Sequence, residues 1–216
     1  MNRESLILLL TTVGTVLLAY LIIAIKVAWE IFHDKRWVVS LGKQKLLEYE
    51  GLLDKCMETA HIDPNSSLSV DNMIEQQGYK INDKLFIPFG EAYTSKKPKR
   101  DVFVCKLLSP ERRHFALAHE LMHIIYKPNE LEEKPRSRNF HSLLKVRNEN
   151  EQIRDYMAAC LILRKDSFWK EIMEAKYFDM TPQKRKEFAY KTAKKYNVEP
   201  STVFRRISEL KVIMGS

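Results

Sequence analysis

The sequence predicts a mostly helical α+β protein with a small sheet, preceded by one transmembrane helix. Residues 6–25 form an apolar run without a charge. Downstream, apolar residues recur at spacings of three and four in several long segments, whereas the segments predicted to form strands all lie within positions 79–107. The apolar fraction of 45% and the charged fraction of 30% fit a chain whose larger part folds in water.

The uncharged run extends from Leu6 to Ile25 and reads LILLLTTVGTVLLAYLIIAI. At about 1.5 Å per helical residue it spans roughly 30 Å, the thickness of a bilayer's hydrocarbon core. A cleaved signal peptide or a buried core helix fits less well, because the run is long and no small-residue cleavage site follows. Residues 1–30 are therefore predicted to be a membrane anchor.

Basic residues flank this run unequally. Only Arg3 precedes it, whereas five follow closely: Lys26, Lys35, Arg36, Lys43 and Lys45. The basic side of a span stays in the cytoplasm, so we expect a single-pass membrane protein whose remaining chain is cytoplasmic. The cysteine count agrees with this location, because three widely spaced cysteines provide no disulfide framework.

Residues 31–65 are predicted to form a juxtamembrane amphipathic helix and a linker, because Leu46, Tyr49 and Leu53 recur at helical spacing. Residues 66–180 should form the main domain. It opens with a short helix over Val70–Gln77, for which Ser69 is the expected N-cap. Tyr79–Ile87 then favours two short strands in a hairpin.

We predict that this hairpin turns at Asn82 and Asp83. Thr94–Arg100 is polar and interrupted by proline, which indicates an exposed loop. The following segment, Asp101–Leu107, is rich in Val and Phe and is predicted to be a strand at the sheet edge.

Three helices are expected next in the main domain. Ser109 and Pro110 start one that should end near Tyr126, and the polar segment Lys127–Asn148 after it predicts a long loop or lid. The others are predicted over Asn150–Leu163 and Asp166–Tyr177.

The last segment, residues 181–216, resembles a helix-turn-helix unit, with helices starting at Pro182 and Pro200. Thr202, Arg205 and Arg206 are expected on the exposed face of its second helix, where a DNA reader places its contacts. The chain has a net charge of +8, and residues 164–216 hold 13 Lys and Arg against 7 Asp and Glu. Nucleic-acid binding is one interpretation, but we favour a scaffold or docking role, because recognition geometry alone does not show function.

The motif HELMH at residues 119–123 carries the predicted chemistry. Residues four apart share a helix face, so His119 and His123 can bind one metal ion. Glu120, about 100° round the helix, stays free to take a proton from water, which is the division of roles in a hydrolytic zinc site. The alternative is two core histidines bonded to carbonyl groups, with Glu120 at the surface.

A catalytic zinc takes a third protein ligand, which must come from elsewhere in the chain. The candidates are His141, Glu149, Glu151 and Asp155. Glu151 and Asp155 share a face of the helix predicted over Asn150–Leu163, and packing alone does not choose between them. Whichever carboxylate does not bind the metal can orient a histidine through its second ring nitrogen.

RRHFALAHELMHIIY, from Arg112, followed by EQIRDYMAACLIL, from Glu151, resembles the ImmA/IrrE family of metallopeptidases. The resemblance covers roughly residues 66–212 and implies a zincin-like fold with Zn²⁺, in which Glu151 is the third ligand. It also implies a protein substrate, since some members cleave helix-turn-helix repressors. Met122, Arg154, Asp155 and Arg164 depart from the family pattern without removing a proposed ligand.

The sequence thus predicts a membrane-tethered, zinc-dependent endopeptidase that cleaves a specific protein, in particular a transcriptional regulator. Tyr126, His141 and Tyr156 are candidates for the donor that stabilises the oxyanion, although no motif selects among them. The alternative function is a membrane-anchored regulator that binds DNA or protein and whose peptidase site is vestigial.

Overall fold

The computed structural model describes residues 41–63, 68–87, 90–95, 99–127 and 149–215. The chain divides into two compact units, Met1–Gly42 and Lys43–Ser216, and nearly all described residues belong to the second. The predicted anchor, residues 1–30, lies outside the described residues. Among those that are described, no helix is both long and apolar enough to cross a membrane.

The sheet has three strands in the order β1-β3-β2, namely β1 (Lys80–Lys84), β3 (Asp101–Cys105) and β2 (Ala92–Thr94). β1 runs parallel to β3, and β2 runs antiparallel to it. The predicted hairpin is wrong: Asn82 and Asp83 lie inside one strand, opposite Phe103 and Val104 of β3. The predicted edge position of β3 is also wrong, because β3 is the central strand.

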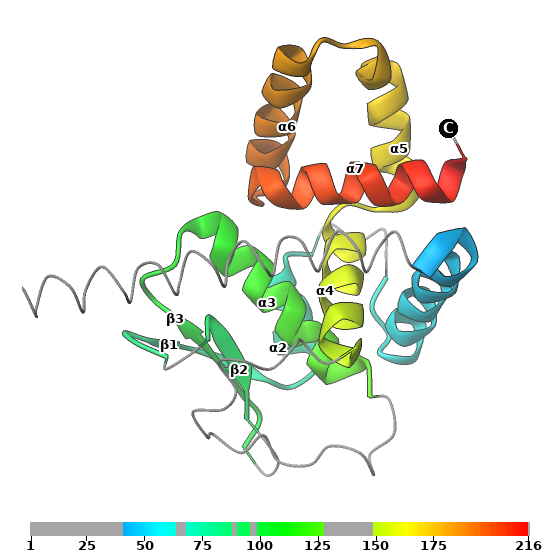
Figure 1. Ribbon diagram of the computed structural model, residues 1–216. Coiled ribbons are helices and arrows are strands. Elements are labelled where there is room, and N and C mark those ends of the chain that lie inside the picture. Colours follow the sequence, from blue (N-terminus) through cyan, green and yellow to red (C-terminus); the bar gives the residue numbers. More distant parts are fainter. Residues whose placement is uncertain (1–40, 64–67, 88–89, 96–98, 128–148, 216) are drawn as a thin grey trace, which may run out of the picture. The chain divides into compact units, whose positions relative to one another are not determined.

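Helix α3 (Pro110–Ile125) packs against β2 and β3 (Figure 1). The β3 residues Val102 and Val104 are completely buried, as the alternation of a half-covered strand requires. The predicted start of α3 is confirmed, since the Ser109 hydroxyl accepts a hydrogen bond from the Arg112 amide. α2 (Val70–Gln76) likewise has its predicted N-cap and packs against α3 and β1.

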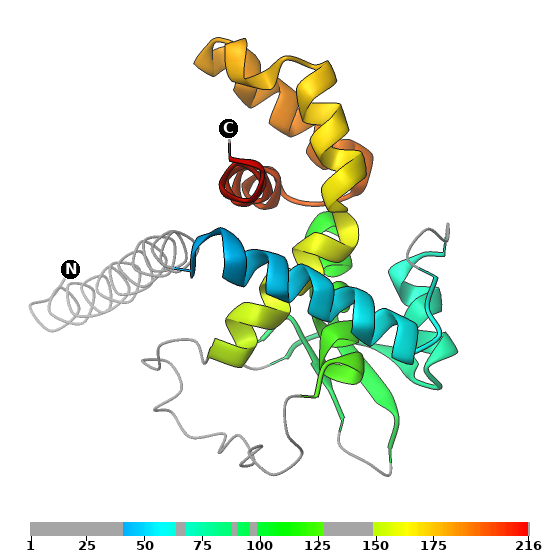
Figure 2. The same cartoon turned by 90° about the vertical axis from the view of Figure 1, so that its right-hand side faces the viewer.

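Helix α4 (Glu149–Ile162) lies alongside α3, and the two make extensive contacts (Figures 1 and 2). The predicted helix over Asn150–Leu163 is therefore confirmed. Every residue from Gln152 to Leu161 is buried, and Ala158 and Ala159 leave room for close approach. α4 is thus covered on more than one side, which requires partners for its polar residues.

The helix of residues 41–59 supplies one of these covers. Leu46, Tyr49, Leu53 and Met57 are buried on one side, which confirms the predicted amphipathic pattern. The Tyr156 hydroxyl of α4 donates to the Leu46 carbonyl oxygen at 3.3 Å. Figure 2 shows this helix, in blue, beside α4.

The C-terminal elements are α5 (Lys165–Glu174), η2 (Tyr177–Asp179), α6 (Pro182–Tyr196) and α7 (Pro200–Met214). The helix predicted over Asp166–Tyr177 ends earlier, at Glu174, before Lys176 adopts a left-handed conformation with φ 51°. α6 and α7 pack together, as a helix-turn-helix unit requires, and Asn197 provides the left-handed turn between them.

The predicted exposure of Arg206 is wrong. Arg206 has no exposed surface, and its Nη2 lies 2.6 Å from Glu50 Oε1. Its Nε donates to the Leu163 carbonyl oxygen, and Arg205 forms an ion pair with Glu209. Arg206 therefore points into the protein, whereas Arg205 is 23% exposed.

Candidate metal centre

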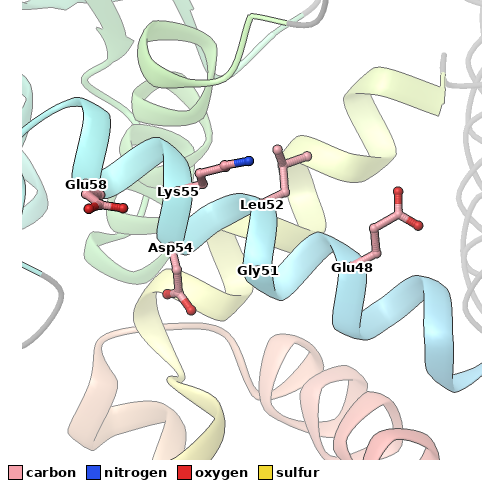
Figure 3. Close-up of a pocket in the computed structure, with 6 residues that line it drawn as sticks. All are labelled: Glu48, Gly51, Leu52, Asp54, Lys55 and Glu58. Atoms are coloured by element: carbon pink, nitrogen blue, oxygen red, sulfur yellow. The ribbon is translucent and has the colours of Figure 1, made fainter.

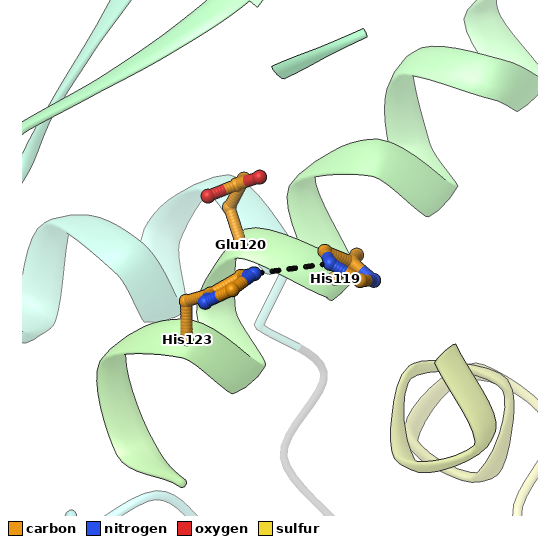
Figure 4. A group of neighbouring side chains, drawn as sticks. All are labelled: His119, Glu120 and His123. Carbon is orange, nitrogen blue, oxygen red and sulfur yellow. Dashed lines mark hydrogen bonds between the residues drawn. The ribbon is translucent and has the colours of Figure 1, made fainter. Parts of the chain in front are cut away.

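The two motif histidines project from the last turns of α3 and converge. His119 Nε2 and His123 Nε2 are 3.1 Å apart, and their ring centroids are 4.9 Å apart (Figure 4). Their side chains are 16% and 18% exposed, so the pair is shielded but reachable from solvent. Their spacing of four residues puts them on one helix face, as the sequence predicted.

Glu151 of α4 reaches the same point. Its Oε2 lies 3.3 Å from His119 Nε2, and its Oε1 lies 3.6 Å from His123 Nε2. Ligand atoms around a tetrahedral zinc ion, each about 2.0–2.2 Å from it, are separated by about 3.3–3.6 Å. Two imidazole nitrogens and one carboxylate group therefore lie at spacings that fit a bound metal ion such as zinc.

Asp155, the other carboxylate considered from the sequence, takes a different position. Its Oδ1 lies 2.6 Å from His119 Nδ1, on the far side of the ring from Nε2. Burial alone lowers the pKa of His119, but the hydrogen bonds to Asp155 and Glu151 raise it to about 10. Without a metal ion, the His119 ring is therefore protonated on both nitrogens at neutral pH. An incoming metal ion must displace one of these protons.

Glu120 is buried beside the pair, with 6% of its surface exposed (Figure 4). Its carboxylate, together with the two imidazoles, forms a group of ligand atoms within 4.8 Å of one another. Glu151 is thus a second carboxylate beside the same two imidazoles, with contacts of 3.3 and 3.6 Å. Glu120 Oε2 instead accepts a hydrogen bond of 2.7 Å from Thr94 Oγ1 of β2.

Sequence reasoning missed two residues at this centre. Thr94 was assigned to a loop, because nothing local marks a three-residue strand. Arg154 was noted only as a departure from a family pattern, yet its Nη1 donates to Glu151 Oε1 at 3.0 Å. A spacing of three on one helix was the available signal for that pair.

The residues predicted as oxyanion donors differ in their accessibility. Tyr156 is completely buried, and its hydroxyl contacts Leu46 and Glu50, so a substrate cannot reach it. Tyr126 ends α3, with its ring 5.8 Å from the Arg154 guanidinium carbon. His141 and nearly all of the predicted lid lie outside the described residues. Glu149 is exposed at the start of α4.

A pocket of about 510 Å³ lies elsewhere, on the helix of residues 41–59 (Figure 3). Its lining residues all belong to that helix: Glu48, Gly51, Leu52, Asp54, Lys55 and Glu58. The lining contains no histidine, so it lacks the imidazole ligands that α3 supplies to the metal centre.

Comparison with known proteins gives one family match. A peptidase family model described as the IrrE N-terminal-like domain matches residues 75–208, well over half of the chain. The matched range contains every residue of the centre described above. No curated protein gives a match.

Proposed function

The chain belongs to the IrrE N-terminal-like domain family of peptidases, and from this premise we propose that it is a zinc-dependent endopeptidase. His119, His123 and Glu151 would hold the ion. The observation that carries the proposal is the convergence of three side chains: the two Nε2 atoms are 3.1 Å apart, and the two Glu151 oxygens lie 3.3 and 3.6 Å from them. A donor set of two imidazoles and one carboxylate suits zinc.

Zinc would supply Lewis acidity, which polarises a peptide carbonyl and makes water acidic near neutral pH. Glu120 has the role of general base: it accepts a proton from the attacking water and returns it to the leaving amine. The hydrogen bond from Thr94 holds the Glu120 carboxylate beside the histidines. Asp155 accepts from His119 Nδ1 and so would keep Nε2 directed at a bound ion.

The substrate backbone would be bound along β2, the strand that reaches Glu120. β2 lies at one edge of the described sheet, with β3 as its neighbour. An extended peptide can add to such an edge through main-chain hydrogen bonds. This proposal replaces the sequence-based choice of β3, whose two sides are both paired.

We further propose that the peptidase is tethered to the membrane and faces the cytoplasm. The uncharged run from Leu6 to Ile25 and the basic residues after it support this arrangement. The proposed substrate is a specific protein, in particular a transcriptional regulator with a helix-turn-helix. N-terminal sequencing tests the tether, because a secreted form cleaved near residue 30 would contradict it.

The alternative is a membrane-anchored binding protein whose peptidase site is vestigial. The compact arrangement of His119, His123 and Glu151 argues against decay, since a site without function need not keep three converging ligands. The burial of Arg206 removes one of the three residues that were expected on the exposed face of α7. We therefore retain the enzyme as the proposed function.

The decisive experiment compares the wild type with Glu120→Gln. We expect the variant to lose cleavage by about 10²–10⁴-fold, because the general base is gone, while zinc content and thermal stability stay unchanged. The readout is a cleavage product of a transcriptional regulator encoded nearby and co-expressed with each variant. Glu58→Gln, the same change at an exposed position of the helix of residues 41–59, is the matched control.

Two outcomes would contradict the proposal. One is cleavage by Glu120→Gln at the wild-type rate. The other is a folded wild-type protein without stoichiometric zinc, measured by elemental analysis.

A further inference from the structure

Arg154 is a buried cation beside the proposed zinc site. It is 4% exposed and lies on α4, three residues after Glu151. Its Nη1 is 3.0 Å from Glu151 Oε1, and its guanidinium lies over the Tyr126 ring at 5.8 Å. A guanidinium in so dry a place requires an anionic partner, and Glu151 provides it.

The contacts of Glu151 divide between its two oxygens. Oε2 lies 3.3 Å from His119 Nε2, whereas Oε1 receives the hydrogen bond from Arg154 and lies 3.6 Å from His123 Nε2. Charge-assisted hydrogen bonds are the stronger class, so Arg154 competes effectively for Oε1.

The formal charge of the centre also favours this cation. Glu120, Glu151 and Asp155 are three carboxylates close to the two imidazoles. With a divalent ion bound they would leave one negative charge in a region that is largely shielded from water. Arg154 brings this sum to zero, which lowers the electrostatic cost of assembling the ligands.

We propose that Arg154 is a positioning residue that reserves Oε1 of Glu151 and so limits this carboxylate to one oxygen on the bound cation. The inference rests on the proposed metal site. A carboxylate that binds through one oxygen keeps the ion four-coordinate with a position free for water, as a hydrolytic site requires. Without Arg154, both oxygens of Glu151 would turn to the ion and raise its coordination number.

Cobalt(II) tests the proposal without a substrate, because its visible absorption depends on coordination number and is strongest for four-coordinate, tetrahedral ions. The full-length protein is freed of metal with a chelator and titrated with Co²⁺. Three variants are compared with the wild type. Arg154→Met fills the space without charge, Arg154→Lys retains the charge and a donor, and Arg164→Met removes an arginine that pairs with Asp54 away from the site.

We expect one intense cobalt band per chain in the wild type, in Arg154→Lys and in Arg164→Met. Arg154→Met should still bind one ion, with a severalfold loss of molar absorbance that marks five-coordination. A full-intensity band in Arg154→Met would overturn the inference and leave the proposed function standing. A wild type that binds no cobalt would overturn both.

Should Arg154→Met fail to fold, which circular dichroism detects, Arg154→Lys and Arg154→Gln decide the question. Gln has a neutral donor, so its band should be weaker than that of Lys if the charge matters. Equal bands of wild-type intensity in both would overturn the inference.

Discussion

Arg154 and Arg206 are two buried arginines with different surroundings. Both are almost inaccessible, at 4% and 0% exposure, and both pair with glutamates. Arg206 contacts Glu50 at 2.6 Å and Glu209 at 3.4 Å, and it also donates to the Leu163 carbonyl oxygen. The polar groups of Arg206 therefore connect three elements: the helix of residues 41–59, the end of α4, and α7.

Glu151, the partner of Arg154, also contacts the two motif histidines. Glu151 directs its carboxylate toward two imidazole nitrogens, which lie only 3.1 Å apart. These two nitrogens can share one hydrogen bond at most, so this group gains from a shared ion. A buried ion pair whose polar atoms all have partners within the protein indicates a structural role. A buried ion pair beside converging ligand atoms indicates a metal-binding site.

The largest effect on stability is expected from the substitution of Arg206, and this substitution tests the comparison most directly. Arg206→Met should lower the free energy of unfolding by about 3–5 kcal/mol, because Glu50 and Glu209 lose their buried partner. Chemical denaturation of the metal-free protein measures the change, with the partly exposed Arg164→Met as control. A loss below about 1 kcal/mol would show that the two arginines do not differ in the way described.

Asp155→Asn should have a smaller effect, confined to the metal. The buried carboxylate accepts from His119 Nδ1 at 2.6 Å, and its removal should weaken zinc binding by about 10–100-fold. Competition with a chromogenic chelator measures the dissociation constant. Asp54→Asn, the same change at the pair with Arg164, should leave zinc affinity as it is. Equal affinity in wild type and Asp155→Asn would remove Asp155 from the site.

Arg205→Ala should have the smallest effect. Arg205 is 23% exposed and pairs with Glu209 through Nε at 2.9 Å. Partly exposed pairs of this kind contribute about 0–1 kcal/mol, and Glu209 keeps its contact with Arg206. Denaturant unfolding beside Arg206→Met gives the comparison directly, and a loss equal to that of Arg206→Met would refute the distinction between adjacent residues.

Local signals in the sequence predicted the helices and the motif well. Ser69 and Ser109 mark helix starts that the structure confirms, because an N-cap acts within three residues. The histidine pair follows from a spacing of four on one helix. Arg154 and Glu151 also lie within one turn, so that pair was within reach of the same reasoning.

Non-local contacts account for the failures. Asn82 and Asp83 suggest a turn by residue type, yet β1 continues through them because β3 pairs with it from 21 positions away. Arg206 resembles a surface residue until Glu50, 156 positions earlier, is placed beside it. No local pattern contains the partner that makes such a burial acceptable.

The position of α4 has a further consequence. Asp155 and Tyr156 are neighbours on this helix, yet one contacts His119 and the other contacts Leu46 and Glu50. One side of α4 therefore faces the proposed metal site, and another side packs against the helix of residues 41–59. A substitution that suits one side must also be acceptable on the other, so we expect α4 to tolerate fewer replacements in a saturation screen than any other described helix.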